Sequence, residues 1–237
     1  SENAVSISNV KGDIKLEDVS FKYNDSSHRV LKHINLEVKA GSYVALVGSS
    51  GAGKTTLCNL IPRFYDCTAG EVLVDGVNVK DYKLDDLRHK IGFVLQKSEL
   101  FSETIEQNIR WGDAEASDEE VRRAAEIAQA DEFISGFTEG YKDMITEKGS
   151  SLSGGQKQRL SIARAIVKKP EILIFDDSMS ALDLSTDAKL QKALHEKLKG
   201  TTVIMIAQRV ASVMRADKIA VIDNGRIAAF DTHDNLM

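Results

Sequence analysis

Short apolar stretches dominate the first hundred residues and return after residue 170. In the first of them, Ile14 and Leu16 alternate with polar residues, and Val19 and Phe21 do the same after a slip between Leu16 and Val19. This pattern predicts half-buried strands with one irregular strand at the start. The further expected strands contain INLEV, YVALVG, EVLVDG and IGFVLQ in the first part and ILIF, TVIMIA, KIAVID and RIAAF in the last.

The spacing of apolar residues changes between about residues 102 and 169, where a helical period replaces the short strand-like stretches. The stretch SDEEVRRAAEIAQADEF reads as one helix, with Ser117 as its N-cap and Glu120 completing a capping box. A later helix carries leucines four residues apart and ends near Gly200. Strand–helix alternation at both ends of a helical middle predicts an α/β core with an inserted helical subdomain at about 102–169.

Composition limits the classes of function. The chain has 237 residues, 42% of them hydrophobic, and a formal net charge of −5, so it can bury a core and has no general attraction to nucleic acid. Its longest apolar runs are about five residues, against the roughly 18 that a membrane helix needs, and we expect this piece to be soluble. The start SENAVS lacks a methionine, which suggests a processed piece, and Cys58 and Cys67 are expected to be free thiols.

The strongest chemical motif is GSSGAGKTT, which follows YVALV and precedes a helix expected from Thr55 to Phe64. It matches the phosphate-binding loop, in which glycine amides surround phosphate oxygens, a lysine reaches the β- and γ-phosphates and a hydroxyl binds Mg²⁺. The alternative is a glycine-rich turn whose lysine has no role, and the strand before and helix after it favour phosphate binding. The candidate ATP-binding residues are Gly48, Ser49, Ser50, Gly51, Ala52, Gly53, Lys54, Thr55 and Thr56.

Two adjacent acids end the strand ILIF. Asp176 fits the acid that a phosphate-binding loop needs at the end of a neighbouring strand to hold Mg²⁺, usually through water. Asp177 would then stand beside the γ-phosphate, where it could polarise an attacking water. The alternative is that both acids only cap a helix.

A second anion-binding motif lies about a hundred residues after the first. In LSGGQKQRL, Ser153, Gly154 and Gly155 stand at the start of a basic amphipathic helix. A serine hydroxyl and two unhindered glycine amides at a helix start suit an anion. One nucleotide does not obviously need two such loops.

Together, LSGGQ and the phosphate loop resemble the ATP-binding domain of ABC transporters, and the resemblance covers essentially the whole chain. It implies a P-loop NTPase core, with a mixed sheet that has an antiparallel part, over residues 13–237. Residues 1–12 would be the end of a linker from a membrane domain fused in front. In that family two such domains pair head to tail, each ATP lying between the phosphate loop of one and the LSGGQ of the other. Ser153, Gly154, Gly155 and Gln156 would therefore bind the partner's nucleotide.

The resemblance assigns further residues. Tyr23 matches the aromatic residue that stacks on adenine, although a plain edge-strand tyrosine is the alternative. Gln96 matches the glutamine that senses Mg²⁺ and the γ-phosphate, so the metal set becomes Thr55, Gln96 and Asp176. SALD, residues 180–183, matches the loop that passes between the two sites.

The residues that flank these motifs resemble the exporter branch of the family. In that branch each half-transporter carries a membrane domain followed by its ATPase, which lies at the cytoplasmic face of the membrane. The stretches that carry this resemblance are RFYDCTAGEVLVDG, LRHKIGFVLQ and LFSETIEQNI. Glu147 lies where that branch contacts its coupling helices. Cys67 replaces a common proline, which we expect to be neutral.

Two departures from the family pattern concern hydrolysis. Asp177 stands where glutamate is usual, and Gln208 stands where a histidine ends the strand. Aspartate withdraws its carboxylate by roughly 1.5 Å, and misplacement by about 1 Å can cost on the order of 100-fold in rate. Gln208 can donate a hydrogen bond but cannot carry a positive charge. The catalytic set Lys54, Asp177 and Gln208 therefore predicts a slow site, and weak ATPase activity for the chain alone.

A slow site beside an intact LSGGQ resembles one half of a heterodimeric exporter, in which this chain completes the competent site of a different partner. The alternatives are a homodimer that hydrolyses slowly through Asp177 and a regulatory nucleotide-binding module without turnover. ABC-type ATPases of DNA repair have long coiled coils, and those of translation carry two ATPase domains per chain. The sequence has neither sustained heptads nor a second phosphate loop, and no nucleic-acid partner is expected.

Overall fold

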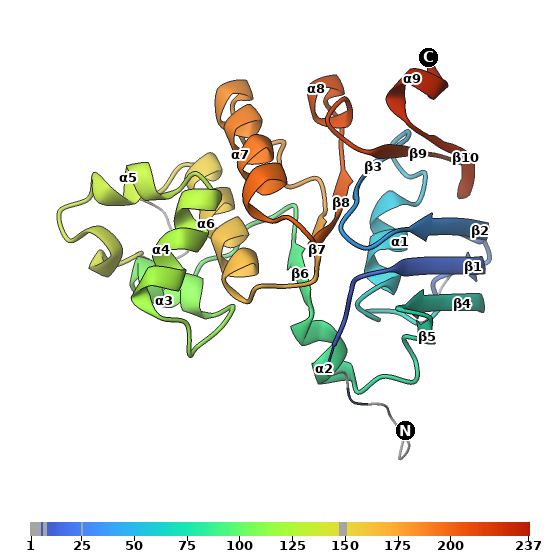
Figure 1. Ribbon diagram of the computed structural model, residues 1–237, viewed down its shortest axis with the longest axis horizontal. Helices are drawn as coiled ribbons and strands as arrows, with labels where there is room; N and C mark the ends of the chain where they lie inside the picture. The colour runs from blue at the N-terminus through green and yellow to red at the C-terminus, as the bar shows by residue number, and fades with distance from the viewer. Residues whose placement is uncertain (1–5, 7–8, 25, 147–150) are drawn as a thin grey trace. The chain divides into compact units, whose positions relative to one another are not determined.

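The computed structural model describes residue 6 and residues 9–24, 26–146 and 151–237. Contacts divide the chain into two compact units. The first consists of Ser1–Ile91 and Gly200–Met237, drawn from blue to teal and in red in Figure 1, and the second is Gly92–Lys199, drawn from green to orange. The expected boundary of the linker at residue 12 and of the helical subdomain at about 102–169 stay predictions.

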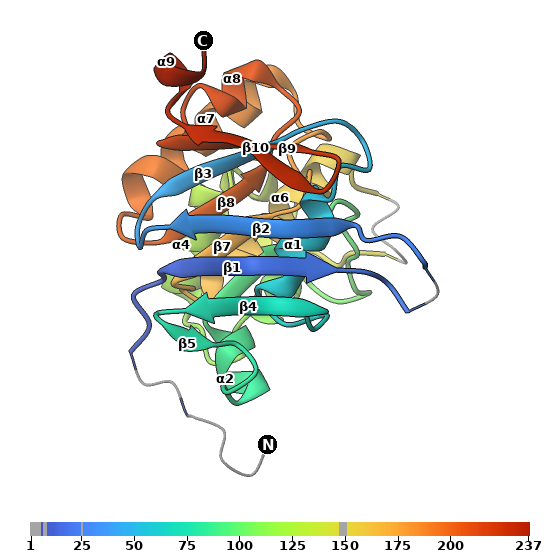
Figure 2. The same cartoon turned by 90° about the vertical axis from the view of Figure 1, so that its right-hand side faces the viewer.

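An antiparallel sheet in the first unit contains β1 (Ile14–Phe21), β2 (Leu31–Val38), β4 (Ala69–Val74) and β5 (Val77–Asn78), in the order β2-β1-β4-β5. Figure 2 shows these strands side by side. The expected slip is confirmed, since the β1–β2 register shifts between Leu16 and Val19. Asp18 adopts φ 49° there, which turns the strand while its apolar residues stay buried.

The remaining strands of the first unit are β3 (Tyr43–Val47), β8 (Thr202–Ile206), β9 (Lys218–Asp223) and β10 (Arg226–Asp231). They run in the order β10-β9-β3-β8, with β3 parallel to both β8 and β9 and with β9 and β10 antiparallel. The helices of this unit are α1 (Lys54–Leu60), α2 (Leu84–His89), α8 (Val210–Val213) and α9 (His233–Leu236). β8 is buried along its whole length, as continuous apolar sequence predicts.

The second unit is mainly helical. Its strands are β6 (Ile91–Val94), which begins at the last residue of the first unit, and β7 (Ile172–Phe175). Its helices are α3 (Ile105–Arg110), α4 (Asp118–Ile127), α5 (Asp131–Ser135), the 3₁₀ turn η1 (Gly140–Lys142), α6 (Gly154–Val167) and α7 (Leu184–Lys197). Within this unit α6 packs against α3 and α4, as Figure 1 shows. No helix among the residues that the structure describes is long and apolar enough to cross a membrane.

One helix prediction is half wrong. The stretch from Ser117 to Phe133 forms two helices, because Gln129 adopts φ 59° and ends the helical path. The predicted N-terminus is confirmed: the Ser117 hydroxyl accepts from the Glu120 amide, and the Glu120 carboxylate accepts from the Ser117 amide. A capping box therefore fixes where α4 begins, whereas nothing so local marks where it ends.

Candidate nucleotide site

The phosphate loop joins β3 to α1 in the first unit, and two of its glycines have no alternative. Gly48 adopts φ 154°, and a Cβ there would lie 2.2 Å from the Ile222 carbonyl oxygen. Gly53 adopts φ 111°, and its Cβ would lie 2.8 Å from a Leu31 methyl group. Side chains at these positions would push the loop off β9 and β2. The two glycines therefore allow the loop to lie close against β9 and β2.

Lys54 folds back over its own loop. Its Nζ donates to the Gly48 carbonyl at 2.8 Å and to the Ser49 carbonyl at 2.7 Å. Thr55 is exposed at the start of α1, and Thr56 is 6% exposed. The ammonium group therefore lies at the mouth of the loop, where a β- or γ-phosphate could replace the carbonyls as its partner.

Tyr23 is joined to the same loop. Its hydroxyl shares a 2.9 Å hydrogen bond with the Thr56 hydroxyl. Its ring meets Phe21 edge to face at 4.8 Å between centroids and Tyr65 at 5.4 Å. The structure thus brings two predicted ATP-binding residues, Tyr23 and Thr56, into direct contact, and it fixes the tyrosine ring with two aromatic neighbours.

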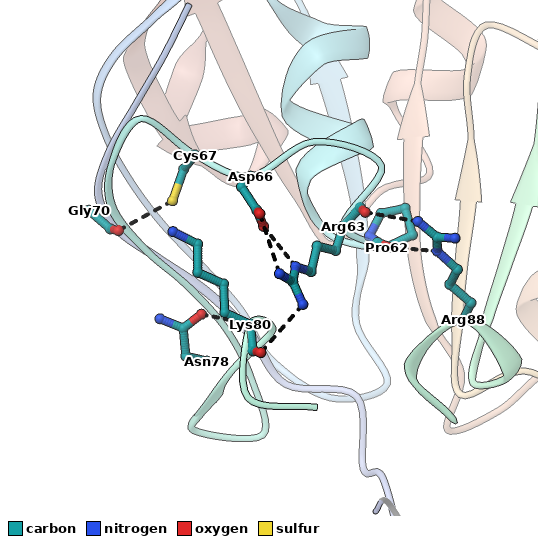
Figure 3. Close-up of polar contacts among 8 residues, drawn as sticks. All are labelled: Pro62, Arg63, Asp66, Cys67, Gly70, Asn78, Lys80 and Arg88. Carbon is teal, nitrogen blue, oxygen red and sulfur yellow. Dashed lines mark hydrogen bonds and ion pairs between the residues drawn. The ribbon is translucent and has the colours of Figure 1, made fainter. Parts of the chain in front are cut away.

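The far end of α1 is held by arginine (Figure 3). Arg88 donates to the Pro62 carbonyl at 3.1 Å and to the Arg63 carbonyl at 2.9 Å, and its guanidinium lies over the Phe64 ring. These two carbonyls lie just past the end of α1 at Leu60, so Arg88 holds the turn by which the chain leaves the helix. Arg63 in turn donates to Asp66 at 2.7 Å, and this hydrogen bond lowers the pKa of the Asp66 carboxyl. Both ends of the phosphate-loop helix are therefore fixed within one unit.

The predicted acids lie in the second unit, at the end of β7. Asp176 is 8% exposed, and its backbone amide donates to the Val94 carbonyl at 2.9 Å, which places it beside the end of β6. Asp177 adopts φ 47° and accepts a 3.1 Å hydrogen bond from the Gln96 side chain. Gln96 and Asp177, which lie 81 positions apart in the sequence, are thus brought together.

The donors assigned to Mg²⁺ have suitable chemistry. Thr55 offers a hydroxyl oxygen, Asp176 a carboxylate and Gln96 an amide, all hard oxygen ligands of the kind that Mg²⁺ takes together with water. Gln96 uses its Nε2 toward Asp177, so its amide oxygen is the atom that would face a metal. The donor set fits the ion.

The signature LSGGQ opens α6. The Ser153 hydroxyl accepts from the Gln156 amide at 3.2 Å, and the Ser153 amide donates to the Gln156 side-chain oxygen at 2.9 Å, which completes a capping box. Ser153 and Gly154 are exposed. A Cβ on Gly154 would meet nothing within 4 Å, whereas one on Gly155 would lie 3.2 Å from the Ala181 carbonyl oxygen. The helix start is therefore open on the side of Gly154 and closed on the side of Gly155.

The loop after the acids is tied at both ends. The Ser180 hydroxyl donates to the Asp177 carbonyl at 3.0 Å. Asp183 caps α7 by accepting from the Thr186 amide and hydroxyl, and the bond from the hydroxyl is the main cause that lowers the pKa of Asp183. SALD is thus a fixed turn between the acids and α7.

The phosphate loop, the paired acids and the LSGGQ helix have counterparts among known proteins. The family model described as ABC transporter matches residues 31–180. The chain belongs to the ABC transporter family. An ATP-binding/permease protein of Bacillus subtilis (strain 168), named YgaD and designated for multidrug export, is 46% identical over 235 residues, which are 99% of this chain and 40% of that protein. A Staphylococcus aureus (strain NCTC 8325 / PS 47) protein of the same designation is 48% identical over 227 residues, 96% of this chain and 39% of its own length.

A solved structure agrees. The bacterial Atm1-family ABC exporter with ATP bound superposes with a TM-score of 0.94 at 40% identity, covering 100% of this chain and 41% of that one. The chain thus spans about two fifths of the length of the relatives it matches. The predicted family and the α/β P-loop fold are confirmed: this is an ABC ATP-binding domain. The relatives named above are export proteins, like the members of the exporter branch that the sequence resembles.

Sequence reasoning missed one residue of the ABC domain that contacts its motifs. Gln158 is 1% exposed on α6 and reaches Leu95 and Ser98, on either side of Gln96. The available signal was position: Gln158 lies four residues before Ile162 on the buried helix face, where a polar side chain needs a partner.

Two other assigned residues lie elsewhere. Gln208 is exposed in the first unit, two residues after the end of β8. Glu147, expected to contact coupling helices, lies outside the described residues. The roles of all these residues toward nucleotide remain predictions.

Proposed function

We propose that this ABC domain binds Mg-ATP and hydrolyses it, weakly when alone, as the ATP-driven part of an exporter at the cytoplasmic face of a membrane. The relatives support this proposal, because they are named as ATP-binding/permease proteins and extend well beyond the region that this chain covers. In the proposal, a membrane domain precedes the ATPase and residues 1–12 belong to the linker.

The observation that carries the proposal is the glycine-dependent loop with Lys54 folded into it and Tyr23 bonded to Thr56. In the proposed site, the loop amides and Lys54 bind the phosphates and Tyr23 stacks on adenine. Thr55, Gln96 and Asp176 hold Mg²⁺, which supplies charge neutralisation of the β- and γ-phosphates. Asp177 orients the attacking water and Gln208 donates to the γ-phosphate.

We further propose that this cis site is slow and that the LSGGQ helix completes a faster site on a different half-transporter. The short carboxylate of Asp177 and the uncharged Gln208 support slow turnover in cis. The exposed start of α6 at Ser153 and Gly154 supports a role toward a partner's nucleotide. A homodimer is the second candidate, and it is favoured by the presence of a complete phosphate loop and a complete signature in one chain.

The first test is a calorimetric titration of the purified chain with Mg-ATP. Lys54→Ala removes a charged donor and should weaken binding by about 10- to 100-fold, since hydrogen bonds to charged groups contribute about 1.5–3 kcal/mol. Lys189→Ala, on the exposed face of α7, is the matched control and should bind like the parent. Equal affinity of the parent and Lys54→Ala would show that the nucleotide site is assigned wrongly.

A further inference from the structure

Gln158 is a buried amide in the second turn of the signature helix α6. Its side chain is 1% exposed, so it cannot exchange its protein partners for water. A buried amide in a helix interior needs partners for its donor and its acceptor, and losing either costs more than never having had the group. The hydrogen-bond partners of Gln158 therefore show which segment of the chain it fixes in place.

Both partners lie in the segment that carries Gln96. Gln158 Nε2 donates to the Leu95 carbonyl at 3.2 Å, and Gln158 Oε1 accepts from the Ser98 hydroxyl. Leu95 and Gln96 share one peptide plane, because the carbonyl of the first is bonded to the amide nitrogen of the second. Gln158 is thus hydrogen-bonded to the peptide group that joins Leu95 to Gln96.

Gln96 continues the chain of contacts. Its Nε2 donates to Asp177 Oδ2 at 3.1 Å. A hydrogen-bonded route thus runs from the acid at the end of β7 through Gln96 and the Leu95 peptide to Gln158. From there the capping box of Ser153 and Gln156 lies within the same helix, one turn away. Every residue of this route lies within the second unit.

We propose that Gln158 is a positioning residue that transmits nucleotide and Mg²⁺ binding at Gln96 and Asp177 to the start of the signature helix. The proposal rests on the proposed function, in which Gln96 and Asp177 face the Mg-ATP bound by the same chain. In the proposal, the backbone at Gln96 shifts when its side chain binds the metal, and the Leu95 carbonyl, which belongs to the adjoining peptide group, shifts with it. Gln158 must follow, because its buried amide has no alternative partner in water. α6 is a rigid helix, so its Ser153 end moves too.

A glutamine on α7 serves as a comparison, because its hydrogen-bond partner lies in its own helix and not in the segment that carries Gln96. Gln191 on α7 is also buried, at 3% exposure, and its Nε2 donates to Asp187 within its own helix. Gln191→Met and Gln158→Met make the same chemical change at similar depth in the same unit. Only Gln158→Met cuts the route to Gln96, so the pair separates transmission from packing.

The experiment is hydrogen–deuterium exchange of the whole 237-residue chain with and without saturating Mg-ATP, read on peptides that cover residues 151–162. Bound Mg-ATP should slow exchange there by about fivefold or more, at the lower end of measured couplings between sites. Gln158→Met should lose this ATP dependence while its affinity for Mg-ATP stays within about threefold of the parent, below the range of a typical coupling. Gln191→Met should keep the parent's response.

Three results would overturn the inference. Gln158→Met could keep the parent's ATP-dependent slowing, Gln191→Met could lose it equally, or the parent could bind Mg-ATP with no change at α6. If Gln158→Met does not fold, Ser98→Ala removes one of the two bonds and should reduce the ATP-dependent slowing. An undiminished response in Ser98→Ala would contradict the inference as well. Failure of the proposed function is seen separately, as absence of Mg-ATP binding in the titration of the parent.

Discussion

Asp177 shows how one residue sets both backbone and chemistry. It adopts φ 47°, a left-handed conformation that aspartate tolerates better than most residues. A glutamate there would carry the carboxylate roughly 1.5 Å further, at a modest backbone cost. The short side chain fits its turn and its bond from Gln96. The same shortness is what should make it a poor base.

Restoring reach and charge should therefore raise turnover. The double variant Asp177→Glu with Gln208→His should hydrolyse ATP faster than the parent, by at most about 100-fold, which is what about 1 Å of misplacement can cost. The measurement is steady-state ATPase activity at saturating ATP and at protein concentrations that allow dimerisation. Sedimentation of both proteins is the control, since tighter dimers would also raise the rate. No increase in turnover would disprove the geometric explanation of the slow site.

The two signature glycines should respond differently to alanine. Gly155→Ala should have a free energy of unfolding about 1–3 kcal/mol below that of Gly154→Ala, because both alanines favour the helix but only the Cβ at position 155 would press on the Ala181 carbonyl oxygen, at 3.2 Å. Gly154→Ala has open space and should leave stability unchanged or slightly higher, since alanine favours a helix. Thermal unfolding followed by circular dichroism compares the two. A Gly154→Ala variant as unstable as Gly155→Ala would contradict the open helix start.

At the scale of elements, α1 is fixed at both ends, by the glycine loop before it and by Arg88 after it (Figure 3). Arg88 reaches two carbonyls with one planar group, and lysine cannot reproduce that fork. The firmness of the phosphate loop should therefore depend on a side chain far along the sequence from it.

Both Arg88→Ala and Arg88→Lys should destabilise the chain. Each loses charged hydrogen bonds to the Pro62 and Arg63 carbonyls, so the free energy of unfolding should fall by about 1–3 kcal/mol and Tm by roughly 2–10 °C. Thermal unfolding measures this, with Arg123→Ala on the exposed face of α4 as the control. If Arg88→Lys were as stable as the parent, a positive charge alone would account for the stabilisation. The pair of hydrogen bonds to the Pro62 and Arg63 carbonyls would then contribute nothing to the free energy of unfolding.

Elements could be predicted from sequence where a local rule fixes them. Continuous or alternating apolar runs marked the strands, and even the slip between Leu16 and Val19 was visible as a broken alternation. The Ser117–Glu120 box marked where α4 begins. The break at Gln129 was invisible, because a left-handed residue that is neither glycine nor asparagine carries no local signature.

The same distinction applies to the candidate site, where some features follow from local sequence and others do not. The phosphate loop and LSGGQ are short motifs whose chemistry follows from contiguous residues, so the sequence reveals them. The bonds from Gln96 to Asp177 and from Gln158 to Leu95 join residues more than sixty positions apart, and only the folded chain brings them together. Contacts between residues so far apart in the sequence depend on how the chain packs, and the spacing of residues within a motif does not predict them.

At the scale of the whole molecule, the assigned residues distribute between the two units. The phosphate loop, Tyr23 and Gln208 belong to the first unit, and Gln96, the acids and the signature helix belong to the second. In the proposal, Asp177 and Gln208, which stand where the family usually has glutamate and histidine, slow hydrolysis at the chain's own site. The signature, which the proposal assigns to the partner's site, has every residue of its motif. That imbalance is the basis of the heterodimer proposal.

Comparing signature and acid variants in the complete exporter decides between a heterodimer and a homodimer. Ser153→Ala combined with Gly154→Ala removes a donor and fills the open helix start, while the chain itself has room for the added methyl group. Loss of one donor aimed at developing charge typically costs about 100- to 1,000-fold, so turnover of a heterodimer should nearly vanish. Asp177→Asn should matter far less there, because its site is already slow. In a homodimer every site uses the same Asp177, and both variants should lose activity alike. ATPase activity of the assembled complex at saturating ATP is the measurement, and equal losses would reject the asymmetric arrangement.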